Sequence, residues 1–296
     1  MFENILGNNK IKQELEQAVK LNKLSHSYMF IGTSGIGKKL IAKEFSKMLL
    51  CLGEQKYCNN CKSCIEFDSS NNPDFQIIQP DGSSIKIDQI REMQNKIIEA
   101  PIVSKRKIYL IDDAHLMTKE AQNCLLKTLE EPPEFVVIIL IGSNENSFLS
   151  TIKSRCTIIK FQEIENSEIV KYMEQNYQMT NISENMLQIF SGSIGNAERL
   201  KDKQEDYSKV EEIINNLDKK DLIDIVQASE ILYKSKENIN DILDYINIIL
   251  LKMAKENYLY TNCIKIVENT KKGLAQNANY DMCIDDLLFK MWEEVN

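Results

Sequence analysis

The sequence predicts an α/β fold: a parallel sheet with helices on both faces, followed by two helical regions. Three observations support this prediction. Short runs of β-branched and aromatic residues alternate with helical patterns as far as residue 162. A glycine-rich turn over residues 32–37 joins the first of these runs to a helix. After residue 162 apolar residues recur at three- and four-residue steps, and all five prolines lie before residue 134.

Five short apolar runs are the expected strands, because they are rich in the residue types that favour buried, pleated backbone. Their ranges are Tyr28–Ile31, Phe75–Ile78, Lys107–Ile111, Val136–Ile141 and Thr157–Phe161. Helical patterns separate them, which leaves room for the crossover connections that a parallel sheet requires.

Three helical patterns lie between these strands. They cover Lys38–Leu50, Asp88–Glu99 and Thr118–Glu131. The third begins with a capping threonine and ends before Pro132-Pro133. We expect three regions in all: an α/β domain over residues 1–162, a small helical domain over 163–206 that is interrupted at 191–195, and a helical bundle over 207–296.

The bulk composition describes an ordinary globular chain of 296 residues, of which 43% are apolar and 27% charged. A net charge of −8 argues against a protein that coats nucleic acid by bulk charge. No apolar run approaches the ~20 residues of a membrane span, and residues 1–7 lack the pattern of a signal peptide. We therefore expect a cytoplasmic location, where clustered cysteines are reduced and act as metal ligands.

The segment Gly32-Thr-Ser-Gly35-Ile-Gly37-Lys38 matches a phosphate-binding P-loop between a strand and a helix. Its glycines let backbone N–H groups turn toward phosphate oxygens, and Lys38 reaches the β and γ phosphates. A P-loop continues with Ser or Thr, whose hydroxyl binds Mg²⁺, but this chain has Lys39. An ammonium repels a cation, so Mg²⁺ is not expected. Whether ATP or ADP still binds is left open.

A second departure follows the strand that ends in Asp112-Asp113. A buried strand ending in an acid is typical of the Walker B element, in which Asp112 would face Mg²⁺. Hydrolytic P-loop proteins of this type usually carry Glu at the next position. Asp113 is one methylene shorter, and catalysis tolerates such displacement poorly. His115 is interpreted as a packing or surface residue. Lys39 and Asp113 together predict weak ATP hydrolysis or none.

Four cysteines follow the P-loop helix: Cys51, Cys58, Cys61 and Cys64. Four thiolates at this spacing can surround one tetrahedral Zn²⁺, and a closed set leaves no position for a reactive water. The sequence therefore predicts a structural zinc site, with Lys62 offsetting part of the thiolate charge. The alternative is a set of reduced, unliganded thiols. The other four cysteines lie in apolar contexts and are expected in the core: Cys124, Cys156, Cys263 and Cys283.

Taken in order, the motifs resemble those of the bacterial clamp-loader subunits of DNA polymerase III, a family of AAA+ proteins. The similarity is greatest to the delta-prime type and covers nearly the whole chain. The segments that carry it are His26–Phe30, the P-loop, the four cysteines, Pro80–Lys86, Asp112–His115, Leu125–Pro133 and Ser154–Cys156.

This resemblance implies an AAA+ domain with a zinc module, a helical lid and a helical collar. It implies an open ring with gamma/tau and delta subunits that loads the sliding clamp onto primed DNA. It also implies a role for Arg155, which by itself would be interpreted as a solvated or salt-bridged residue. The arginine of the family's Ser-Arg-Cys motif reaches the ATP of a neighbouring subunit and acts as a catalytic finger in trans.

The departures from the family pattern point to a passive subunit without independent enzymatic activity. Gly195 stands where ATPase subunits of the family carry a sensor arginine. A second sensor position, after the strand Val136–Ile141, is Ser143 or Asn144. Two alternatives are kept: an active motor subunit or other AAA+ ATPase, which Lys39 and Gly195 disfavour, and a zinc-dependent nucleic-acid-binding module, which the net charge of −8 disfavours.

Overall fold

The computed structural model describes residues 2, 5–54, 57–219 and 221–296. Part of the N-terminal segment considered above (residues 1, 3 and 4) and part of the cysteine segment (55–56) lie outside the described residues. The chain divides into two units: Met1–Ile169 with Ser193–Gly195, and Val170–Gly192 with Asn196–Asn296. The domain boundaries predicted at 162 and 206 stay predictions. No helix in the described part of the chain is long and apolar enough to cross a membrane.

The five predicted strands form one parallel sheet in the first unit, with the order β2-β3-β4-β1-β5. The strands are β1 (Ser27–Ile31), β2 (Phe75–Ile78), β3 (Lys107–Ile111), β4 (Val136–Gly142) and β5 (Thr157–Lys160). Each boundary lies within one residue of its prediction. Every residue of β1, β3 and β4 is buried, as expected for central strands covered on both faces. The predicted fold class is confirmed.

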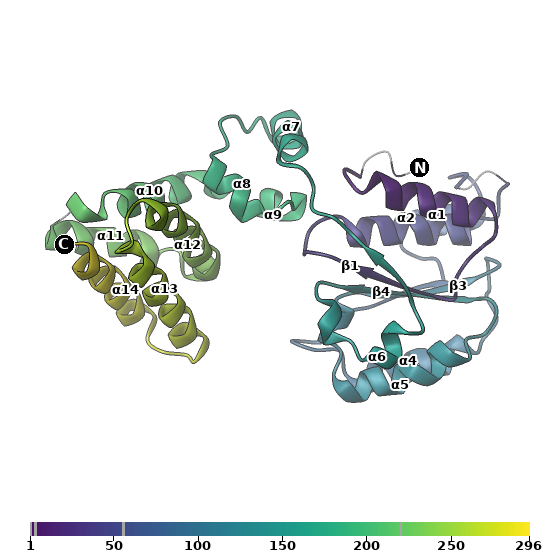
Figure 1. The fold of residues 1–296 in the computed structure, drawn as a ribbon. Coiled ribbons are helices and arrows are strands. Elements are labelled where there is room, and N and C mark those ends of the chain that lie inside the picture. The colour runs from purple at the N-terminus through teal and green to yellow at the C-terminus, as the bar shows by residue number, and fades with distance from the viewer. Residues whose placement is uncertain (1, 3–4, 55–56, 220) are drawn as a thin grey trace. The chain divides into compact units, whose positions relative to one another are not determined.

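Helices cover both faces of this sheet (Figure 1). On one face lie α1 (Asn9–Lys20) and α2 (Lys38–Leu50), and on the other lie α4 (Ile87–Ile97), α5 (Lys119–Glu130) and α6 (Ser150–Lys153). The short helix α3 (Lys62–Asp68) belongs to the cysteine segment. Thr118 caps α5 as predicted, by accepting a hydrogen bond from the N–H of Ala121. Helices α1 and α3 had not been predicted from the sequence.

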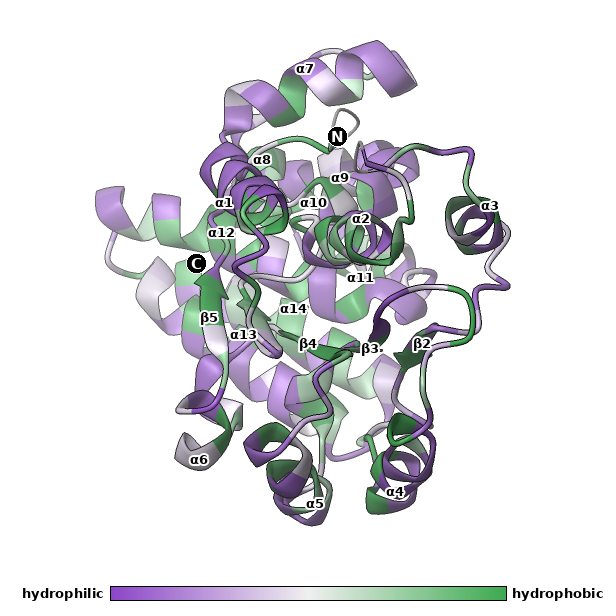
Figure 2. Ribbon diagram, turned by 90° about the vertical axis from the view of Figure 1, so that its right-hand side faces the viewer, coloured by the Kyte–Doolittle hydropathy of each residue, from purple (hydrophilic) through white to green (hydrophobic). Residues whose placement is uncertain are grey.

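Two hydrophobic clusters follow from the alternation of strand side chains between the two faces. One contains Met29, Tyr109 and Leu140, and the other contains Phe30 and Ile139. The strands are accordingly hydrophobic in Figure 2, whereas the helices are hydrophobic only in part. Each large side chain that is fully buried in this way contributes roughly 1.5–3 kcal/mol to folding.

The second unit is helical. Its elements are most of α7 (Asn166–Tyr177), α8 (Glu184–Phe190), α9 (Ile194–Leu200, from residue 196), α10 (Gln204–Asn215), α11 (Leu222–Tyr233), α12 (Ile239–Glu256), α13 (Tyr260–Ala275) and α14 (Tyr280–Val295). Helix α12 packs on α8, α10 and α13, and α14 packs on α11 and α13. Two carboxylates fix this packing: Asp241 pairs with Arg199, and Glu211 accepts hydrogen bonds from Tyr245 (2.5 Å) and Asn185 (2.6 Å).

Asp74 holds the loop that connects α4 to β3. Its carboxylate is fully buried and accepts hydrogen bonds from the backbone N–H groups of Ile102 (2.7 Å), Val103 (2.8 Å) and Ser104 (2.6 Å). The hydroxyl of Ser104 lies 2.9 Å from that of Ser63 in α3. One buried carboxylate therefore ties the entry of a central strand to the cysteine segment.

We predict that Asp74→Ala lowers the free energy of unfolding by roughly 1–3 kcal/mol, because three backbone N–H groups lose the buried carboxylate that accepts their hydrogen bonds. Urea unfolding followed by circular dichroism measures this change. The matched control is Asp81→Ala, since Asp81 is exposed. Equal midpoints for the two variants would show that water replaces the carboxylate at no cost.

Candidate functional site

The P-loop lies at the carboxyl end of β1 and leads into α2. Gly35 and Gly37 have φ values of +74° and +91°, which residues with a side chain rarely adopt. A Cβ on Gly32 would lie 3.0 Å from the carbonyl oxygen of Phe161. The predicted glycines are therefore required by the backbone itself.

Lys38 is bound to its own loop. Its buried ammonium donates hydrogen bonds to the carbonyl oxygens of Gly32 and Thr33, each at 2.6 Å. Burial lowers the pKa of Lys38, and the nearby carboxylates of Asp113 and Asp112 oppose that shift. The lysine that would reach a phosphate thus has two of its three donors bound by the loop.

Lys39 forms an ion pair with Asp112, the predicted metal-facing acid. Its Nζ lies 2.7 Å from Oδ2 of Asp112, whose side chain is 11% exposed. The same carboxylate accepts a hydrogen bond from Gln79 (3.3 Å) and one from the backbone N–H of Asp113 (3.2 Å). The ammonium therefore contacts the carboxylate oxygen of Asp112 that would coordinate a magnesium ion.

Asp113 and His115 follow β3 in the turn. Asp113 is exposed and has φ of +48°, in the left-handed region. His115 is half-buried, and its Nδ1 has no hydrogen-bond partner among the described residues. No polar contact that would orient His115 as a base is present in the described part of the chain.

Gly195 touches the P-loop within the first unit. Its N–H donates to the carbonyl oxygen of Gly35 at 3.0 Å, and a Cβ at position 195 would lie 2.8 Å from Gly35 Cα. Position 195, where no sensor arginine is expected, can therefore carry a side chain only if the backbone of Gly35 shifts.

The two candidate sensor residues, Ser143 and Asn144, are both exposed beyond β4. The side chain of Asn144 accepts a hydrogen bond from the N–H of Asn146 at 2.9 Å and so caps the turn. Buried Gln122, which sequence reasoning missed, fixes this region by donating to the carbonyl of Ser147 (2.9 Å) and accepting from the N–H of Leu149 (2.9 Å).

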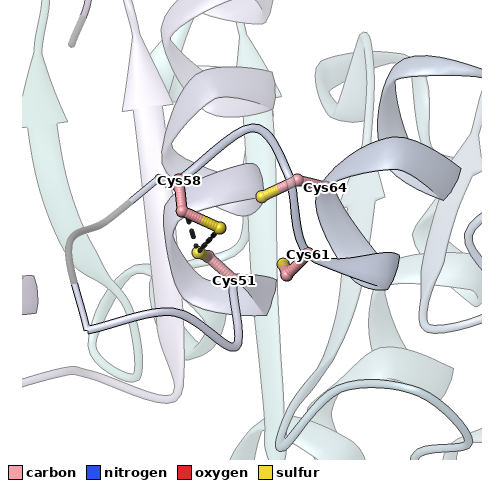
Figure 3. Close-up of side chains that lie close together, drawn as sticks. All are labelled: Cys51, Cys58, Cys61 and Cys64. Atoms are coloured by element: carbon pink, nitrogen blue, oxygen red, sulfur yellow. Dashed lines mark hydrogen bonds between the residues drawn. The ribbon is translucent and has the colours of Figure 1, made fainter.

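The four predicted metal ligands come together (Figure 3). The Sγ atoms of Cys51, Cys58, Cys61 and Cys64 all lie within 4.8 Å of one another, and those of Cys51 and Cys58 are 3.6 Å apart. A Zn–S distance of about 2.3 Å places tetrahedral sulfur atoms roughly 3.8 Å apart, so the cluster fits Zn²⁺. Four protein ligands leave no open position, and the fit is to a structural ion.

The thiols of this cluster influence one another. Burial is the largest influence on Cys61 and raises its pKa, but hydrogen bonds from the Leu52 and Cys64 backbone and from neighbouring thiols bring it down to about 6. The pKa of Cys64 is raised to about 12, first by burial and then by its thiol neighbours. Without a cation, four adjacent thiols cannot all ionise. A divalent ion stabilises all four thiolates.

A buried lysine anchors the segment that carries the cluster. Lys47 is buried in α2 and donates to Asn59 Oδ1 (2.7 Å) and Asp68 (2.9 Å), with the Tyr57 ring centroid 4.6 Å away. Lys62, which was expected to offset thiolate charge, is 70% exposed and pairs with Glu66 at 3.7 Å. Of the other four cysteines, Cys263 is buried as predicted and the rest are half-buried.

Arg155 lies at the opposite end of the sheet from the P-loop. It precedes β5, whereas the P-loop follows β1, and these two strands are parallel neighbours. Five residues of strand separate the two positions, which is roughly 15 Å. The Arg155 guanidinium contacts Glu130 Oε1 (2.7 Å) and the carbonyl of Thr151 (2.8 Å), and its side chain is 33% exposed.

The fold and the loop define a P-loop α/β protein with a closed four-cysteine cluster. A family model described as "DNA polymerase III, delta subunit" matches residues 7–165, which is more than half of the chain, and the chain belongs to this family. The predicted resemblance is thus confirmed at the level of the family.

The chain is 37% identical over 157 residues to DNA polymerase III subunit delta' of Bacillus subtilis, covering 53% of this chain and 48% of that protein. It is 33% identical over 184 residues to subunit tau/gamma of Haemophilus influenzae, covering 61% and 26%. The chain therefore matches about half or less of the length of these relatives. A DNA polymerase III gamma subunit-related protein of Thermotoga maritima superposes with a TM-score of 0.48 at 18% identity, over 95% of this chain and 99% of that one.

We predict that the purified protein carries about one Zn²⁺ per chain, and that Cys61→Ser lowers this content and the thermal unfolding midpoint together. Elemental analysis and a thermal melt with and without a chelator measure both effects. Cys283→Ser is the control, because Cys283 lies outside the cluster. A metal-free wild-type protein that melts unchanged in chelator would contradict the prediction.

We also predict that Gly195→Ala destabilises the first unit by roughly 1–3 kcal/mol, because its Cβ must displace backbone. Gly273→Ala is the matched control, since its Cβ would meet the nearest atoms at 3.7 and 3.9 Å. Denaturant unfolding of both variants tests the close approach of Gly195 to Gly35. A Gly195→Ala protein as stable as the control would refute it.

Proposed function

We propose that this chain is a passive subunit of a bacterial clamp loader, of the delta-prime type, that completes a neighbour's ATPase site without hydrolysing ATP itself. The observation that carries this proposal is the ion pair between Lys39 and Asp112. Family membership supports the clamp-loader role, and the ion pair supports the passive one.

The ion pair opposes magnesium binding through its positive charge. A magnesium ion at a P-loop is held by a hydroxyl after the loop lysine and by the Walker B aspartate. Here the hydroxyl is replaced by an ammonium, and that ammonium lies 2.7 Å from the aspartate. To bind Asp112, a divalent cation would have to displace Lys39 and then remain close to its positive charge. Magnesium-dependent hydrolysis is disfavoured at both ligands.

Two further contacts support the same conclusion. Lys38 directs two of its three N–H donors to the loop's own carbonyls, so at most one is left for a phosphate while these hydrogen bonds persist. Gly195 brings a backbone N–H to the loop in place of a charged side chain. The nucleotide content of the purified protein measures whether ATP or ADP binds without Mg²⁺.

The position of Arg155 supports the proposed role of the chain in the ATPase site of a neighbouring subunit. It lies roughly 15 Å from its own P-loop, so it is too far along the sheet to serve the nucleotide site of the same chain. It is also partly exposed, and such a position suits an arginine that acts on the phosphate of another subunit. We propose Arg155 as that trans-acting residue.

The remaining parts of the proposal rest on the family. We assign residues 207–296 to the collar that holds the ring together, and we propose gamma/tau and delta subunits, the sliding clamp and primed DNA as partners. The setting would be the cytoplasm. The helical character of this region supports an assembly role, because helix α12 packs on three other helices and gives the bundle a core of its own.

We predict that Arg155→Ala lowers the clamp- and DNA-stimulated ATPase rate of the reconstituted loader by about 10³-fold or more, because a trans arginine stabilises charge in the transition state. Lys38→Ala in the same chain should leave the rate nearly unchanged. Both are measured as phosphate release, with ring assembly checked by size-exclusion chromatography.

The two variants separate the competing roles. Loss of rate with Lys38→Ala and not with Arg155→Ala would identify an active motor subunit. An unchanged rate in both variants would show that neither Lys38 nor Arg155 contributes to ATP hydrolysis by the loader. In each case the assembled ring must be intact for the rate to be interpreted.

A further inference from the structure

Arg155 is held from two sides before any partner is present. On one side, its Nη1 donates to the carbonyl of Thr151 (2.8 Å) and to the hydroxyl of Ser154 (3.3 Å), both at the end of α6. On the other side, its Nη2 lies 2.7 Å from Oε1 of Glu130, the last residue of α5. The guanidinium therefore bridges the carboxyl ends of two helices.

The charges explain why these residues meet. The carboxyl end of a helix carries partial negative charge, which attracts a cation and disfavours an anion. Glu130 is an anion at such an end and is stabilised there by a cationic partner. Arg155 is a cation at the end of α6, and its position is favoured by the same field. The pair is 49% and 33% exposed, so it lies at the surface without being fully solvated.

The geometry leaves part of the guanidinium available. It has five N–H donors in a planar fork; Nη1 donates to Thr151 and Ser154, and Nη2 forms an ion pair with Glu130, which leaves the Nε–H without a contact to these three residues. An arginine in solution would have to lose several rotatable bonds when it engages a phosphate. One that is already fixed at three points loses less, which favours the bound state.

We propose that Glu130 is a positioning residue that orients Arg155 toward a phosphate group held by another subunit; this inference rests on the proposed function of Arg155. Glu130 does not touch the phosphate. By fixing the Nη2 end of the guanidinium, it limits the orientations that the rest of the group can adopt.

The test is a set of variants in the reconstituted loader, with ATPase rate measured against ATP concentration. Glu130→Ala should lower kcat by roughly three- to ten-fold, the range expected from freeing one long side chain. KM for ATP and assembly of the ring should not change. Glu130→Gln should restore most of the rate, because its amide oxygen can accept a hydrogen bond from Nη2 at the place where the carboxylate forms the ion pair. Glu131→Ala is the matched control, since Glu131 is the next residue and is exposed.

A double variant separates positioning from a merely structural effect. In an Arg155→Ala background, Glu130→Ala should have no further effect on the rate, because the residue that it orients is gone. An additive loss would overturn the proposal, and so would a Glu130→Ala rate equal to or above wild type. Failure of Glu130→Gln to restore the rate would overturn it as well.

The same set of variants distinguishes a failure of the positioning role of Glu130 from a failure of the proposed function of Arg155. If Arg155→Ala itself leaves kcat unchanged, the proposed function of Arg155 fails and the role of Glu130 fails with it. If Arg155→Ala lowers kcat and Glu130→Ala does not, only the positioning role is lost.

Discussion

The ammonium of Lys39 occupies the side of Asp112 on which a P-loop protein needs a metal ion. An ion pair that is 40% exposed on one partner adds little to stability, on the order of 1 kcal/mol or less. Its importance is that the charge is covalently attached and always present. A magnesium ion binds and leaves together with the phosphates of the nucleotide. Lys39 neutralises Asp112 whether or not nucleotide is bound. In the passive role proposed above, this permanent charge takes the place of the metal ion that a motor subunit would bind.

Two further contacts hold the loop: Lys38 donates to the carbonyl oxygens of Gly32 and Thr33, and the N–H of Gly195 donates to Gly35. Each of these contacts satisfies a backbone carbonyl without a ligand. A loop held in this way has little reason to rearrange when nucleotide arrives, because the free energy of binding must first replace hydrogen bonds that already exist.

The sequence predicted those features that depend on local pattern. Spacing and residue type predict all five strands, the cap and the end of α5, and the grouping of the four cysteines. The replacement at position 39 could be recognised from the loop alone. What could not be predicted is pairing across distance. Lys47 with Asp68, Gln122 with Leu149, and Glu130 with Arg155 each join residues whose proximity is decided by tertiary packing. The role expected for Lys62 beside the thiolates stays a prediction; its ammonium pairs with Glu66, one helical turn away.

The separation between the P-loop and Arg155 explains how one of them can lose its chemistry while the other keeps its geometry. The loop depends on the carboxyl ends of β1 and β3 and on α2, whereas Arg155 depends on the ends of α5 and α6 at the amino end of β5. The residues that contact Lys38 and Lys39 are not those that contact Arg155. Because sites that share no partners behave additively, substitutions in the loop need not disturb the arginine. The sheet acts as a rigid spacer between them, since its central strands are wholly buried. In the function proposed above, a protein built in this way presents an oriented cation to a neighbour, and its own phosphate site contributes to the scaffold.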